Sequence, residues 1–264
     1  MGRGITRRAR SVCDRGGTRS NLVSLWETRG ETLKIDERIS ETTLTVPALL
    51  ASQGQPVLDT SEVRWFATGP LPDDVVAWFA RQKSIAAVEE RCDTYLLRGI
   101  EGTGVKYRNQ RVLEVKLCHS ADANLDLGNG LSAPVLRWLK WRPAELDATW
   151  SASGTRRVDV HKVVLTSSFA SIDGSVAPHA LPGIASVPAC KIELAAVEVG
   201  DVVAWTLGLE ASGPVEARRR VLLDSWRFIA GERPPSCNGS GGRLDVSAAY
   251  PDWLERLRSN RLAG

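Results

Sequence analysis

The stretch that decides the fold lies between residues 59 and 117 and contains four runs, DTSEVRWF (59–66), ERCDTYLL (90–97), GVKYR (104–108) and VLEVKL (112–117). In each run, charged residues recur at every second position, with an apolar or aromatic residue between them. Successive side chains of a β-strand point to opposite faces, so these charges would share one face of each strand. A half-buried strand also alternates, but its polar face seldom carries a charge at every position. Four such strands predict a shared polar interior, as in a closed barrel.

The alternation continues in the second half of the chain. Further strand signals are VLRWLKWR (135–142), residues 157–166, CKIEL (190–194) and DVVAWTLGLEA (201–211), with turn signals at 128–130 and 151–154. Most connections are too short for crossovers, so the strands are expected to be antiparallel. The predicted fold is mainly β, an eight-stranded antiparallel closed barrel, or tunnel, with a few short flanking helices. A two-sheet sandwich with its charges facing water stays open as the alternative.

Two short helices are expected beside the strands. Pro72 and the two aspartates after it are typical of a helix start, and the valine and aromatic residues at 75–79 would form its buried side. This helix is predicted to cover an end of the barrel. In the last twenty residues, Trp253, Leu254 and Leu257 share a helical face. We expect this face to cap the body, with recruitment of a partner as the alternative.

The chain divides into three predicted regions. Residues 1–56 form an Arg-rich extension expected to be disordered, residues 57–232 the barrel domain, and residues 233–264 a flexible linker followed by the short C-terminal helix. No apolar run approaches the ~20 residues that span a bilayer, which predicts a soluble protein without a membrane partner. The five cysteines show neither CxxC pairs nor zinc-ligand spacing, as expected of reduced thiols in a cytoplasmic protein.

The positive charge is concentrated at the N-terminus. Residues 1–20 contain six arginines and one aspartate, whereas the whole chain carries a formal net charge of only +3. The globular part is therefore slightly acidic, which argues against a nucleic-acid partner. Three interpretations of residues 1–20 stay open: an organellar transit peptide, an unstructured arm, or sequence upstream of the true start codon. A further hypothesis is that the barrel domain is an inert scaffold and that the Arg-rich N-terminal segment binds RNA or serves as a targeting arm.

Motifs of other enzyme classes are missing from the sequence. It has no GxxxxGK[ST] phosphate loop, no GxGxxG after a strand, no HExxH and no GxSxG elbow. His161 is a lone histidine in a strand, which is usually structural. The charged positions also have simpler interpretations, because a charged strand face is often solvated and opposite charges can pair across strands to set the register.

The spaced charges between residue 58 and about residue 213 resemble the CYTH superfamily, the triphosphate tunnel metalloenzymes. The best matches are the step from Asp93 to Tyr95 and the hairpin that joins Lys106-x-Arg108 to Glu114-x-Lys116. Members of that family are eight-stranded antiparallel tunnels that bind a triphosphate on basic residues and hold a divalent metal on glutamates. No single motif carries the resemblance.

The resemblance implies a set of site residues. The phosphate ligands would be Arg64, Arg91, Lys106, Arg108, Lys116, Lys140 and Arg142, and the metal-side carboxylates, for Mg²⁺ or Mn²⁺, would be Glu62, Glu114, Glu193 and Glu210. Such chemistry is self-consistent, because basic side chains from several strands can surround a triphosphate and the metal prefers carboxylate and phosphate oxygens. Phosphoryl transfer then needs mainly positioning and neutralisation of charge. No catalytic residue is assigned.

The opening strand departs from the family pattern. The family usually reads Glu-x-Glu-x-Lys there, whereas this chain reads Glu62-Val63-Arg64-Trp65-Phe66. A cation at the position of the second carboxylate repels a divalent ion. Two functions therefore stay open. One is a metal-dependent triphosphate phosphohydrolase, ahead of an adenylate cyclase-like lyase, acting on a triphosphate-containing small molecule or inorganic polyphosphate. The other is a catalytically degenerate tunnel that binds such a polyanion without turnover.

Overall fold

The computed structural model describes residues 57–81, 85–97, 101–128, 130–142, 155–172, 174–178, 187–231, 244 and 246–262. The strands are β1 (Val57–Thr68), β2 (Ile85–Leu97), β3 (Thr103–Arg108), β4 (Val112–Asp126), β5 (Ser132–Trp141), β6 (Arg156–Ile172), β7 (Ser175–Pro178), β8 (Ala189–Val199), β9 (Val202–Ser212) and β10 (Val246–Ser247). The helices are α3 (Asp73–Ala80), α4 (Val215–Ala230) and α5 (Tyr250–Leu262). The predicted N-terminal extension and most of the predicted linker lie outside the described residues.

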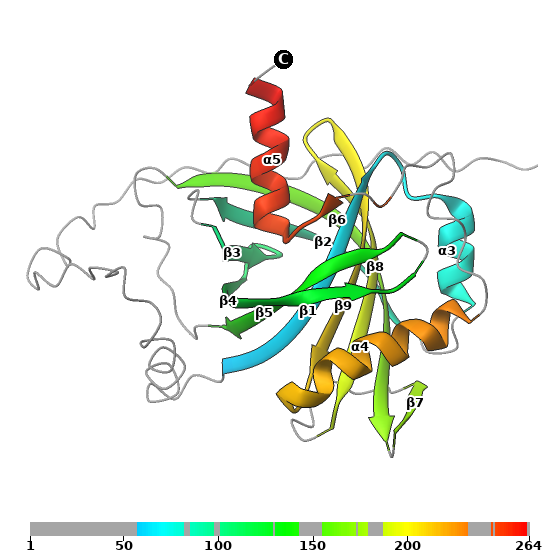
Figure 1. Cartoon of the computed structure of the whole chain (residues 1–264). Coiled ribbons are helices and arrows are strands. Elements are labelled where there is room, and N and C mark those ends of the chain that lie inside the picture. The colour runs from blue at the N-terminus through cyan, green and yellow to red at the C-terminus, as the bar shows by residue number, and fades with distance from the viewer. Residues whose placement is uncertain are drawn as a thin grey trace, which may run out of the picture. The chain divides into compact units, whose positions relative to one another are not determined.

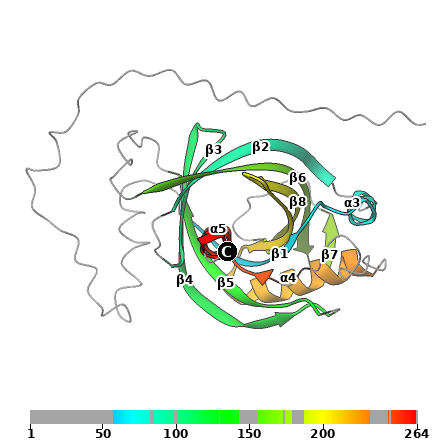
Figure 2. The ribbon, with the colours of Figure 1, turned by 90° about the horizontal axis from the view of Figure 1, so that it is seen from above.

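Eight of the strands form a closed antiparallel barrel (Figures 1 and 2). Their order is β1, β5, β4, β3, β2, β6, β8 and β9, and β9 pairs back with β1 along residues 204–211. Every barrel strand is thus hydrogen-bonded to two neighbours, which rules out two separate sheets and confirms the predicted fold class. The short β7 pairs with β6, and β10 pairs with β1.

The two faces of β1 show how the sequence specifies both the lumen and the outer wall. Glu62 and Arg64 line the interior, whereas Val63 and Trp65 belong to the apolar cluster that includes α3 and α4. Both faces of this strand are buried, since Thr60 to Ala67 are all buried side chains. Alternation therefore places charges inside and hydrophobic residues under the helices.

Helix α3 begins directly after Pro72, as predicted, but it covers a different surface. Its Trp78 packs edge-on against Trp226 of α4, with 6.2 Å between the ring centroids, and both belong to the cluster on the outer wall. The prediction that this helix covers an end of the barrel was therefore wrong. Periodicity identified its buried face but not the surface that the face meets.

Helix α5 closes one end of the barrel through the cluster that its first turns form with barrel residues, and Figure 2 shows it end-on inside the outline of the strands. Trp253 stacks on Phe66 at 4.4 Å between ring centroids, and Tyr250 stacks on Tyr95 at 5.7 Å. Leu254 is buried in the same cluster, and Leu257 packs against it. The prediction that this helical face caps the body is confirmed. No helix in the described part of the chain has the length and apolarity needed to cross a membrane.

Candidate functional site

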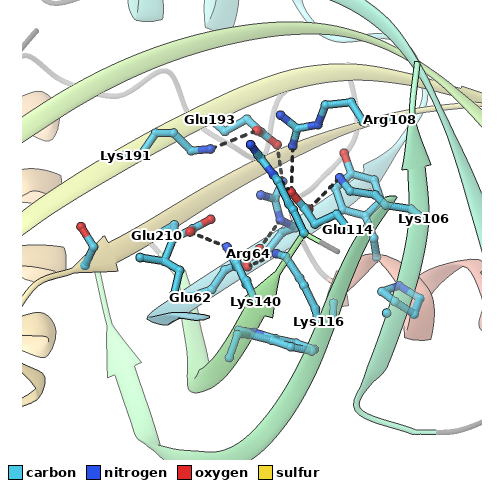
Figure 3. Close-up of a pocket in the computed structure, with 18 of the residues that line it drawn as sticks. Glu62, Arg64, Lys106, Arg108, Glu114, Lys116, Lys140, Lys191, Glu193 and Glu210 are labelled. Carbon is cyan, nitrogen blue, oxygen red and sulfur yellow. Dashed lines mark hydrogen bonds and ion pairs between the residues drawn. The ribbon is translucent and has the colours of Figure 1, made fainter. Parts of the chain in front are cut away.

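The barrel encloses a cavity of about 490 Å³ that is lined by residues from all eight barrel strands and from the start of α5. Nine basic and four acidic side chains line it, and we call this set the lumen charges. They are Arg64, Arg91, Lys106, Arg108, Lys116, Lys140, Arg142, Lys162, Lys191, Glu62, Glu114, Glu193 and Glu210. Figure 3 shows ten of them converging from different strands. The cavity therefore carries an excess of positive charge.

All eleven site residues expected from the sequence line this one cavity. They differ in depth. The Arg142 side chain is 60% exposed, whereas Glu62, Glu193 and Arg64 are buried. Since α5 closes the opposite end, Arg142 and Lys191 lie towards the open mouth of the lumen. The structure thus brings the predicted residues together, while their individual roles stay predictions.

Arg64 occupies the centre of the lumen and bridges two strands. Its Nε donates to Glu62 Oε1 at 2.8 Å, and its Nη1 donates to Glu193 Oε1 at 3.0 Å. Glu62 also accepts a hydrogen bond from Lys116 Nζ at 3.0 Å. Burial alone would raise the pKa of Glu62, but Lys116 and Arg64 outweigh it and hold this pKa well below its usual range. The carboxylate is therefore fully ionised at neutral pH.

Gly208 makes the position of Arg64 possible. It lies on β9 directly between Arg64 on β1 and Glu193 on β8. A Cβ atom at Gly208 would lie 2.5 Å from Arg64 Cζ, a distance that real Cβ contacts essentially never show. Because this glycine has no side chain, the guanidinium can lie across β9 and reach Glu193.

A second charge cluster surrounds Asp93, which is completely buried. Its Oδ2 accepts hydrogen bonds from Lys106 Nζ and Lys162 Nζ, each at 3.0 Å, and its Oδ1 lies 3.4 Å from Arg91 Nε. Burial alone would raise the pKa of Asp93, but Lys162 and Lys106 lower it to about 2. One buried carboxylate thus holds several cations in place.

Lys162 links this cluster to the closed end of the barrel. Its Nζ donates to the Tyr95 hydroxyl at 3.1 Å and lies 3.5 Å from the centroid of the Tyr250 ring. Burial and the nearby Lys106 lower the pKa of Lys162 well below its ordinary value. The cation–π contact with Tyr250 connects α5 to the charged interior.

The remaining lumen carboxylates are also paired with cations. Glu114 lies 3.4 Å from Lys106, 3.6 Å from Arg108 and 3.4 Å from Arg142. Glu210 accepts a hydrogen bond from Lys140. Within the described residues, no three His, Cys, Asp or Glu side chains gather as a metal-binding group. The carboxylates are engaged by cations and not by one another, and the predicted metal site stays a prediction.

Several residues that line the cavity were not among those expected from the sequence. Lys162 lies on the inward face of β6 between Val160 and Val164, and a single charge on an otherwise apolar face was the available signal. Lys191 stands two positions before Glu193, which is the same spacing as in the other strands. The place of Tyr250 had no local signal, because only the closed barrel brings α5 to the lumen. His161 is exposed on the opposite face from Lys162.

Comparisons with known proteins show similarity only at the level of structure. No family model and no curated protein matches the sequence. The PH1819 protein of Pyrococcus horikoshii OT3 is similar to this chain with a TM-score of 0.37 and 10% identity, over 74% of this chain and 99% of its own. A conserved hypothetical protein of Pyrococcus furiosus gives a TM-score of 0.35 and 12% identity, over 65% and 90% respectively. At these values neither structure bears on function.

Proposed function

We propose that the barrel binds a polyphosphorylated ligand, a triphosphate-containing small molecule or inorganic polyphosphate, in its charged lumen. The observation that carries this proposal is the convergence of nine basic against four acidic side chains on one cavity closed at one end. Arg and Lys side chains form strong charge-assisted hydrogen bonds with phosphate oxygens. Desolvating so many cations is costly in a folded core, so their concentration here is best explained by an anionic ligand.

The depth of the side chains suggests how such a ligand is held. Arg108, Lys116 and Arg142 retain partial exposure, at 28%, 23% and 60% of their side chains, and can reorient towards an incoming phosphate. Lys106 and Arg91 are buried and already fixed by Asp93. The ligand would therefore enter from the side of Arg142 and displace carboxylates from the more mobile cations first.

Hydrolysis of the bound triphosphate is the second candidate function. It is favoured by the register of β1 and β9, which places Glu62 directly opposite Glu210 on the lumen face. Mg²⁺ or Mn²⁺ held between them would neutralise phosphate charge. Both carboxylates are already engaged by lysines, however, so binding without turnover fits the geometry better. Phosphate release from tripolyphosphate with Mg²⁺ or Mn²⁺ tests this candidate.

Thermal unfolding of the full chain with tripolyphosphate tests the binding proposal. A ligand at 100 times its dissociation constant adds about 2.7 kcal/mol of stability, which a melting curve resolves. We expect the Arg108→Ala variant to show a smaller shift, because Arg108 is a partly exposed lumen cation. Arg220→Ala is the matched control, since Arg220 lies on α4 with 77% of its side chain exposed. No shift of the wild-type protein at millimolar ligand would contradict the proposal.

A further inference from the structure

We propose that the guanidinium of Arg64 takes the place of a divalent cation in this lumen, so that the polyphosphate binds without any metal. This inference rests on the proposed function and specifies its cofactor requirement. A divalent ion in such a site would have two tasks, to hold carboxylates from separate strands together and to neutralise phosphate charge. The side chains around Arg64 show that a permanent cation performs the first task and is placed for the second.

Arg64 holds together the carboxylates of β1 and β8. Its Nε and Nη1 reach Glu62 and Glu193 at 2.8 and 3.0 Å, and Thr206 Oγ1 lies 3.4 Å from Nη1. A planar guanidinium suits two carboxylates at fixed directions. Burial alone would lower its pKa, but Glu193 and Glu62 raise this pKa well above the ordinary value. The positive charge therefore stays in place at every accessible pH.

A divalent ion would have to displace this cation or others like it. Glu62 and Glu193 are occupied by Arg64, Glu210 by Lys140, and Glu114 lies within 4 Å of three basic side chains. Repulsion between an incoming ion and these cations is strong where solvent is largely excluded. The missing side chain of Gly208 reserves the space for the guanidinium. The arrangement thus favours a resident organic cation over a metal.

The excess of basic side chains supplies the rest of the neutralisation. Counting the four lumen carboxylates and the buried Asp93 that engages Lys106 and Lys162, the basic side chains around the cavity still outnumber the acidic ones. A triphosphate brings several negative charges, which these cations can match without an added ion. The expected behaviour is binding of tripolyphosphate in the presence of a chelator.

Calorimetric titration of the full chain with tripolyphosphate tests this inference, in EDTA and in Mg²⁺ at matched ionic strength. We expect the two affinities to differ by less than about fivefold, the lower end of typical coupling between two ligands. Weaker binding in Mg²⁺ would also support the inference, because the ion would then compete with the lumen cations for the ligand. Binding that needs Mg²⁺, or strengthens beyond that factor, would overturn it and leave the proposed function standing. No binding in either buffer would overturn both.

A variant gives a second readout that does not depend on the polyphosphate. Arg64→Glu places a third carboxylate between Glu62 and Glu193. We therefore expect Mn²⁺ to bind this variant and to stabilise it against thermal unfolding. We also expect the paramagnetic resonance signal of the Mn²⁺ ion to broaden on binding. The wild-type protein and the Arg220→Glu control should show neither effect. Equal stabilisation of all three proteins by Mn²⁺ would count against the inference. If the variant fails to fold by circular dichroism, the titration of the wild-type protein decides alone.

Discussion

A single glycine determines how far the central arginine of the lumen can reach. Gly208 has no left-handed backbone conformation to explain it, and its role is space alone. The guanidinium of Arg64 crosses β9 at this position and meets Glu193 on the far strand. The network at the centre of the barrel thus depends on the absence of one methyl group.

Gly208→Ala is expected to destabilise the protein by about 1–3 kcal/mol, the usual cost of leaving a buried polar group without its partner. The added methyl group would force Arg64 away from Glu193. Urea unfolding measures the change. In an Arg64→Ala background, the same substitution should cost less than about 0.5 kcal/mol, because its target is gone. An equal cost in both backgrounds would contradict this account.

For the proposed ligand, we expect Lys140 to make binding dependent on pH. Burial lowers the pKa of Lys140 to about 8, Lys116 adds to the effect, and Glu210 opposes it. A bound polyphosphate favours the charged lysine and raises this pKa, so affinity should be full below about pH 8 and fall as the pH rises through it. In Lys140→Arg the charge persists, so the loss of affinity between pH 7 and 9 should become smaller than in the wild-type protein, where Lys162 also has a lowered pKa. Titrations across this range, with tripolyphosphate as ligand, measure both profiles.

Among the elements, α5 connects the hydrophobic and the charged halves of the lumen. Trp253 and Leu254 complete an apolar layer with Phe66, while Tyr250 faces both Arg64 and Lys162. One helix therefore closes the barrel and covers the deepest cations. Its removal would expose charged groups that are now shielded from water.

Trp253→Ala should destabilise the protein by about 3–5 kcal/mol, the range for removing a buried aromatic side chain. The substitution removes the stacking on Phe66 and leaves a cavity in the closed end of the barrel. Chemical denaturation measures the loss. Arg258→Ala on the same helix, where the side chain is half exposed, should change stability by less than about 0.5 kcal/mol. Similar values for the two variants would show that α5 contributes little to the barrel.

The elements also show what could be predicted from the sequence. The charges at every second position predicted the barrel. They also predicted that Glu62, Lys106 and Glu114 face one cavity, because strand periodicity determines the face on which each side chain lies. The same periodicity could not predict that Arg64 pairs with Glu193. The two residues are 129 positions apart, and their contact depends on which strands become neighbours when the barrel closes. For the same reason the helix after Pro72 was recognised while its place on the outer wall was not.

At the scale of the whole molecule, the lumen is surrounded by charged side chains contributed by all eight barrel strands. Nine basic side chains around one cavity should favour ligands in proportion to their phosphate number. Each added phosphoryl group can form charge-assisted hydrogen bonds worth about 1.5–3 kcal/mol, or more than about tenfold in affinity. We therefore expect affinity to rise from phosphate to pyrophosphate to tripolyphosphate. Competition calorimetry measures the series, and equal affinities would point to a surface patch instead.

The internal ion pairs have a consequence for selectivity. Each lumen carboxylate already pairs with a cation. An incoming anion would therefore compete for these cations with Glu62, Glu114, Glu193 and Glu210. Chloride or a single carboxylate offers no more charge than one lumen carboxylate, so we expect it to gain little by replacing one. A polyphosphate with several negative charges can replace several of these carboxylates at once. With the proposed function, we therefore expect the lumen to discriminate against singly charged anions and to select ligands of high charge.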